Sequence, residues 1–75
     1  MKATADMYTY RVFWSGEDGA FVASVSEFPS LSNVADSQKE ALNGLSELVA
    51  DVLADMRESG DQPPVPLGCR TYSGK

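Results

Sequence analysis

The residue types that most often carry out catalysis are scarce in this 75-residue sequence. It has no histidine, which is the commonest general acid or base, so Ser-His-Asp and Cys-His arrangements are excluded. The single cysteine, Cys69, has only Arg70 beside it and no candidate base nearby in the sequence. One cysteine without histidine also cannot assemble a zinc site. We therefore expect no enzyme, no metal site and no bound cofactor.

Carboxylates are the abundant ionisable groups, with eleven Asp and Glu against six Lys and Arg and a net charge of −5. Glu17 and Asp18 form an acidic pair at the tip of an expected hairpin, which fits either a weak cation contact or an ordinary acidic turn. A two-metal nuclease would need carboxylates on neighbouring strands, and the interiors of the expected strands contain none. Nucleic acids are bound through cations that neutralise phosphates, so direct binding of DNA or RNA by this chain alone is disfavoured.

A second set of carboxylates recurs at intervals of four, four and three residues along a predicted helix: Glu47, Asp51, Asp55 and Glu58. This spacing stacks like charges on one side of the helix, which destabilises an isolated helix by a few tenths of a kcal/mol per pair. This acidic stripe is either an ordinary solvated face or a docking face for a basic partner. Its charge suits a basic partner, although net charge also maintains solubility.

Two segments rich in β-branched and aromatic residues, 8–14 and 20–26, predict an antiparallel hairpin. The polar loop at 15–19 between them has hairpin length, and its two glycines are expected to supply positive φ angles. Alternation along the strands places one set of side chains on a single face of the hairpin: Tyr8, Tyr10, Val12, Trp14, Phe21, Ala23 and Val25.

The strongest local pattern predicts one long helix. Ser37-Gln38-Lys39-Glu40 fits the capping box, in which a serine hydroxyl and a glutamate carboxylate satisfy backbone amides. Apolar residues then recur with a helical period: Leu42, Leu45, Val49, Val52, Leu53 and Met56. Gly60 and the prolines after it predict the helix end. Gly44 inside the helix costs about 1 kcal/mol relative to alanine, and it would allow close contact with the sheet.

Prolines mark where extended segments end or turn. Pro29 cannot donate to a strand ladder, so the second strand should end near Phe28, and a weak third strand is predicted at 31–34. The run at 62–66 must be extended, either as a rigid connector or as a PxxP ligand. Residues 67–72 then predict a short last strand that returns to the sheet.

Together these elements predict an α+β domain, with an antiparallel three- to four-stranded sheet and one long helix packed on one face, in the order β-β-β-α-β. The chain should form one domain over residues 1–75, with its core at about 8–72 and frayed ends. A chain this short buries only about 60% of its unfolded surface, so we expect a homo-oligomer that adds stability. The sequence shows no signal peptide and no membrane-spanning run, and we expect a cytoplasmic protein.

The order and spacing of several short segments resemble the pattern of the HicB-like antitoxin family over about residues 8–67. The segments match the family's strand opening, strand exit, helix cap, first helical turn and later Pro-x-Pro: Tyr10 to Trp14 with Gly19 to Val25, Glu27-Phe28-Pro29, Asp36-Ser37, Glu40-Ala41 and Pro64-Val65-Pro66. Ser30 and Ala35 stand where the family usually has glycine. The resemblance implies a partial ribonuclease-H-like fold.

In that family the N-terminal domain masks a small basic HicA-type toxin, an RNA-cleaving protein, within a toxin-antitoxin system. The resemblance therefore implies an antitoxin-like role in protein binding for this acidic chain. It includes no DNA-binding domain, so the chain would be a short form without operator binding. We expect the acidic stripe to be the main contact with the toxin and the Glu27-Phe28-Pro29 corner to be a second one. These contact residues are chosen by charge and position, because no family motif fixes them.

Two other functions fit the sequence. The first is a stand-alone HicB-like protein without a toxin, which would act as an oligomeric adaptor or regulator. The second is a small hydrolase or ligand-binding domain that uses Cys69 or the acidic loop.

Overall fold

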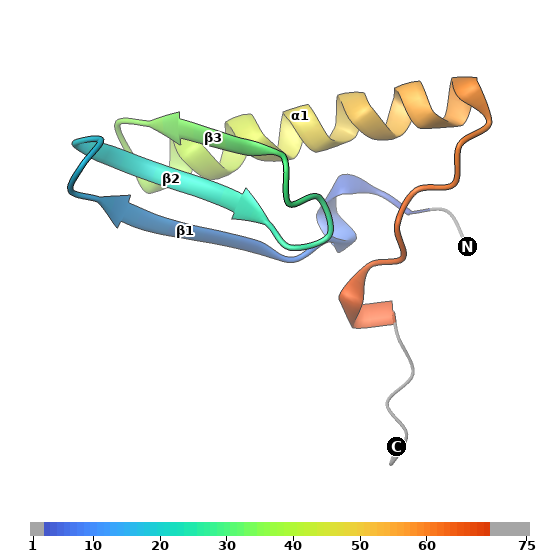
Figure 1. Ribbon diagram of the computed structural model, residues 1–75, viewed down its shortest axis with the longest axis horizontal. Helices are drawn as coiled ribbons and strands as arrows, with labels where there is room; N and C mark the ends of the chain where they lie inside the picture. The colour runs from blue at the N-terminus through green and yellow to red at the C-terminus, as the bar shows by residue number, and fades with distance from the viewer. Residues whose placement is uncertain (1–2, 70–75) are drawn as a thin grey trace, which may run out of the picture.

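The structure, a computed structural model, describes residues 3–69 of the chain. A short 3-10 helix, η1 (Ala5–Met7), precedes three strands: β1 (Tyr10–Ser15), β2 (Ala20–Val25) and β3 (Ser32–Ala35). The long helix α1 (Gln38–Ser59) and a second 3-10 helix, η2 (Leu67–Cys69), follow. The strands form one antiparallel sheet in the order β1-β2-β3, and α1 lies along one of its faces (Figure 1). The expected α+β class, with one long helix packed on an antiparallel sheet, is confirmed.

The first hairpin forms where the sequence places it. β1 and β2 pair in register from Tyr10 opposite Val25 to Ser15 opposite Ala20. The Gly19 amide donates to the Ser15 carbonyl at 2.9 Å, and Gly19 has a φ of 61°. The second expected positive φ, at Gly16, is wrong, because this hairpin loop turns with one left-handed residue. The weak third strand is confirmed, displaced by one residue from its predicted bounds.

Both ends of α1 are set by local hydrogen bonds, as the sequence predicts. At the start, the Glu40 amide donates to the Ser37 hydroxyl at 3.1 Å. At the end, Gly60 adopts a φ of 80° and its amide donates to the Arg57 carbonyl at 3.3 Å. The Asp61 amide donates to the Met56 carbonyl at 2.8 Å, which completes a Schellman motif.

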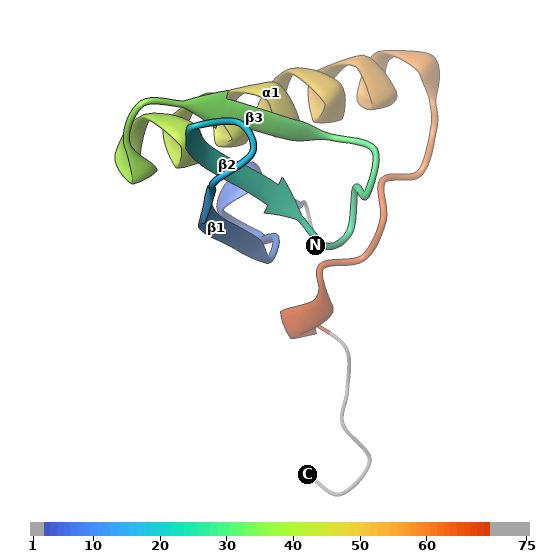
Figure 2. The ribbon, with the colours of Figure 1, turned by 60° about the vertical axis from the view of Figure 1, so that its left-hand side comes forward.

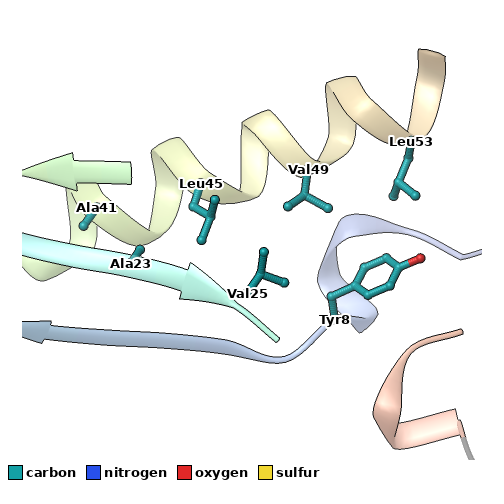
Figure 3. Close-up of a cluster of buried hydrophobic side chains, with 7 residues drawn as sticks. All are labelled: Tyr8, Ala23, Val25, Ala41, Leu45, Val49 and Leu53. Carbon is teal, nitrogen blue, oxygen red and sulfur yellow. The ribbon is translucent and has the colours of Figure 1, made fainter. Parts of the chain in front are cut away.

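The core lies between α1 and the sheet, and Figure 3 shows its side chains. Seven buried residues form one cluster: Tyr8, Ala23, Val25, Ala41, Leu45, Val49 and Leu53. The helical members recur every four residues, so one row of α1 faces the sheet along most of the helix. The predicted stripe is therefore partly wrong: Leu42 is 37% exposed, whereas Ala41, which the pattern omitted, is fully buried.

Trp14 also departs from its expected environment. Alternation puts it on the helix side of the sheet, yet 56% of its surface is exposed. Its ring packs edge-on against Phe21, with 5.1 Å between ring centroids. Trp14 stands at the end of the edge strand β1, and the buried row of α1 begins only at Ala41, so nothing in the core cluster covers this ring.

Gly44 permits the close approach of α1 to the sheet, which confirms that expectation. Asn33 of β3 donates from Nδ2 to the Ala41 carbonyl at 3.1 Å. A Cβ placed on Gly44 would collide with that side-chain amide nitrogen and lie only 3.0 Å from the Asn33 Cγ. The missing side chain therefore leaves room for a hydrogen bond between sheet and helix.

The segment after α1 acts as an extended connector back to the first strand. Pro64 accepts a hydrogen bond through its carbonyl from the Tyr8 hydroxyl at 2.7 Å, and Pro66 is buried. The predicted strand at 67–72 is wrong for its first half, because Leu67–Cys69 forms η2, where a 3-10 turn replaces extended backbone. The other half of that prediction, from 70 to 72, lies outside the described residues.

Two leucines of α1 provide a matched test of this packing. Leu45→Ala should lower the free energy of unfolding by about 2–5 kcal/mol, because it empties a fully buried site. Leu42→Ala should lower it by about 1 kcal/mol or less, because Leu42 lies partly in solvent. Urea denaturation followed by circular dichroism measures both values, and the milder Leu→Val pair gives the same ranking if Leu45→Ala does not fold. Equal losses at the two sites would contradict the observed orientation of α1.

Candidate protein-binding surfaces

The described part of the chain holds no arrangement typical of a catalytic or metal site. Residues 3–69 include no group of three His, Cys, Asp or Glu side chains placed to hold a metal ion, and no pocket opens among them. At the hairpin tip, the Ser15 hydroxyl donates to the Asp18 carboxylate at 3.0 Å and accepts from the Asp18 amide at 3.3 Å. The Asp18 carboxylate thus braces its own loop. The side chain of Cys69 lies outside the described residues.

No helix within residues 3–69 combines the length and the apolar character that crossing a bilayer requires.

The acidic stripe lies exposed along α1. All four of its side chains, those of Glu47, Asp51, Asp55 and Glu58, are open to solvent. The first three each follow a buried residue of the core row by two positions, which places them about 200° around the helix from it. The stripe therefore faces away from the sheet. The structure brings these four predicted residues together on one surface.

The charges of the acidic stripe are not arranged for helix stability. The basic residues of α1 are Lys39 and Arg57, one near each end, so the helix has no cation between the first and last turns. Asp55 and Glu58 lie towards the C-terminus of α1, where the helix dipole disfavours negative charge. The like charges at intervals of four also repel one another. The stripe thus costs the isolated fold some stability.

The second predicted contact, the Glu27-Phe28-Pro29 corner, is divided between interior and surface. Phe28 is half-buried and its ring meets Tyr8 edge-on, with 5.2 Å between centroids. Pro29 is exposed. The corner follows the end of β2 and contacts the first strand and η2, whereas the acidic stripe lies on the far side of α1. The structure therefore does not join the two predicted contacts into one surface.

Glu27 has a role that the sequence did not reveal. Its carboxylate accepts three hydrogen bonds: from the Thr9 amide at 2.9 Å, the Thr9 hydroxyl at 3.1 Å and the Leu67 amide at 2.8 Å. One side chain thereby links the start of the sheet to the segment after α1. The only sequence signal for this role is a single glutamate placed directly after an otherwise uncharged strand.

The ionisation of Glu27 follows from these contacts. Burial raises the pKa of the Glu27 carboxyl, whereas hydrogen bonds from the Leu67 and Thr9 amides favour the charged form. The balance leaves this pKa below its ordinary value. Close by, burial raises the pKa of the Tyr10 hydroxyl, and the carboxylates of Asp6 and Glu27 raise it further.

Comparison of the chain with protein-family models, with curated proteins and with solved structures found no match.

Glu27 can be tested by its effect on stability as a function of pH. At neutral pH, Glu27→Gln should lower the free energy of unfolding by about 1–3 kcal/mol, because it replaces a charged acceptor of three hydrogen bonds. A group with a lowered folded pKa stabilises above its unfolded pKa of about 4.3, and that contribution disappears as the pH falls through the folded value. The difference between the two proteins should therefore shrink in acid.

Glu47→Gln is the matched control, because Glu47 is exposed on α1. It should change stability by no more than about 0.5 kcal/mol at either pH. Urea denaturation at neutral and acidic pH measures all three proteins. A Glu27→Gln loss that is the same at both pH values would show that the charge of this carboxylate is not what stabilises the fold.

Proposed function

We propose that this chain is an antitoxin-like binding module that masks a small basic RNA-cleaving protein of the HicA type. The observation that carries the proposal is the order of the HicB-like segments along the chain, from the Tyr10 strand opening to Pro64-Val65-Pro66. The exposed acidic stripe supports it independently, because it is a surface of single-sign charge that a basic protein would complement.

The physical roles of charge and apolar area differ in this proposal. The acidic stripe would steer a basic toxin toward α1 and raise the association rate, particularly at low salt. Apolar contacts beside the stripe would then hold the complex, and Leu48 offers one, since it is 36% exposed on the same helix. Masking follows if the bound chain covers the basic surface with which the toxin contacts RNA, because phosphate binding depends on those cations.

The finer assignments belong to the same proposal. The fold would be a partial ribonuclease-H-like domain in the order β-β-β-α-β, with a last strand that can begin only after Cys69. The module would act in the cytoplasm as a short form that does not bind DNA or RNA by itself. Catalysis has no part in this function, and neither has a cofactor.

A stand-alone oligomeric adaptor without a toxin is the second candidate. One observation favours it: β1 and β3 are both edge strands within the described sheet, and edge strands are frequent sites of association.

The direct test is co-expression with a small basic protein encoded beside the gene for this chain. The proposal predicts that the neighbour arrests growth when expressed alone, that co-expression relieves the arrest, and that the two proteins purify together. Relief without a complex, or a complex without growth arrest by the neighbour, would contradict masking and favour the adaptor.

Charge reversal tests the acidic stripe within that complex. Asp51→Lys combined with Asp55→Lys should weaken toxin binding by about tenfold or more at low salt, mainly through slower association. Asp6→Lys combined with Asp61→Lys changes the net charge by the same amount at exposed positions elsewhere, and it should alter the affinity far less. Surface plasmon resonance at two salt concentrations measures both. Equal affinities for the two double variants would remove the helix face from the proposal.

A further inference from the structure

The face of the sheet that turns away from α1 carries an apolar row across all three strands. Phe13 lies directly opposite Val22, and Val22 lies directly opposite Val34. Their strand neighbours Val12 and Ala23 belong to the helix side of the sheet, so alternation turns this row outward. In Figure 1 the strands lie in front of α1, and no other described helix or strand crosses this outer face.

The apolar row is open to solvent in the single chain. Phe13 is 39% exposed and Val34 is 53% exposed, while Val22 in the central strand is half-buried by its neighbours. An antiparallel sheet with one solvated face normally places polar residues on that face. Three apolar side chains in adjacent strands are therefore an unusual arrangement for a surface that stays in water.

The surroundings of the row are small and almost uncharged. On one side lie Arg11, Ser24 and Ser32, paired across the strands, and on the other lie Ser15 and Ala20. Apart from Arg11, these side chains are short enough for a second sheet to approach to the usual spacing of about 10 Å. An apolar centre with a small polar border is typical of a protein interface.

Charge identifies what this face would bind. The chain carries a net charge of −5, but the strand positions of the outer face contain no carboxylate, and their one charged residue is Arg11. A basic partner would be drawn to the acidic stripe on the opposite layer. Two copies of this chain can meet outer face to outer face without placing carboxylates of the two sheets against each other.

From these observations we infer that the outer face of the sheet is a homodimer interface, in which the rows of Phe13, Val22 and Val34 from two copies pack together. A stable interface buries roughly 800 Å² per partner, which two three-stranded faces with their flanking loops can supply. The interface is separate from the proposed toxin contact. It leaves both acidic stripes pointing outward from the dimer.

The position of Arg11 selects one two-fold arrangement. Arg11 lies two residues before Phe13, and the acidic hairpin tip begins after Ser15, two residues beyond Phe13 on the other side. A two-fold axis along the row would exchange these ends, so Arg11 of each copy would face Glu17 of its partner. The Arg11 guanidinium now lies over the Phe13 ring, 5.2 Å from its centroid, and Glu17 is exposed.

Two valines of similar exposure test the face. Val34→Lys should raise the monomer–dimer dissociation constant by about tenfold or more, because it places an unpaired charge in the interface. Val65→Lys is the control, since Val65 is 56% exposed in the connector after α1. It should leave the constant within about twofold, a change of less than 0.5 kcal/mol.

Sedimentation equilibrium over a dilution series measures the three proteins, and circular dichroism checks that each is folded. A wild type that stays monomeric throughout the series, or equal dissociation constants for the two lysine variants, would overturn the inference.

A charge exchange tests the arrangement. Arg11→Glu and Glu17→Arg should each weaken self-association, because each places like charges at both of the proposed pairs. An equimolar mixture of the two variants should dimerise about as well as the wild type, because the mixed dimer restores opposite charges at both pairs. A mixture that dimerises no better than either variant alone would overturn the antiparallel arrangement, while Val34→Lys still decides the face.

Discussion

The packing of a single helix against one face of a three-stranded sheet is the interaction on which the rest of this structure depends. The buried row of α1, with Leu45, Val49 and Leu53 at its centre, meets Val25 and Ala23 of the central strand. Asn33 and Gly44 bring the edge strand β3 against the same helix. Because the helix covers one face only, the other face of the sheet and the far side of the helix both remain at the surface.

Closure of this core depends on the two segments outside the sheet. Tyr8 enters the cluster from the residues before β1, and its hydroxyl reaches the Pro64 carbonyl. Glu27 adds a carboxylate that holds amides from both ends of the described chain. In Figure 2 the connector after α1 passes back beside the N-terminal segment, as these hydrogen bonds require. A small core is thereby closed by polar contacts of long sequence separation.

The sequence predicted the features that arise from neighbouring residues. The Ser37 cap, the Gly60 end and the first hairpin each depend on a few consecutive positions, so their local chemistry was sufficient. The features that it missed depend on how distant segments meet. The exposure of Leu42, the bonds of Glu27 to residues 18 and 40 positions away, and the turn at η2 are set by tertiary packing.

The candidate surfaces divide in the same way. The acidic stripe was predictable because helical spacing alone gathers its residues, and their exposure follows from the buried row opposite. The apolar row needed the strand register, since Phe13, Val22 and Val34 become neighbours only when all three strands are paired. The two surfaces lie on opposite layers of the fold. A dimer through the sheet would therefore present two acidic stripes, and a basic partner with two such sites nearby would bind with an added effective concentration.

The most direct measurement is a titration of the isotope-labelled chain with the small basic protein encoded beside its gene, followed by amide chemical shifts. Masking through the helix predicts that the largest shift changes fall along residues 47–58 and that Phe13, Val22 and Val34 change little. Shift changes confined to the sheet, or none at concentrations well above those at which co-expression relieves growth arrest, would contradict it.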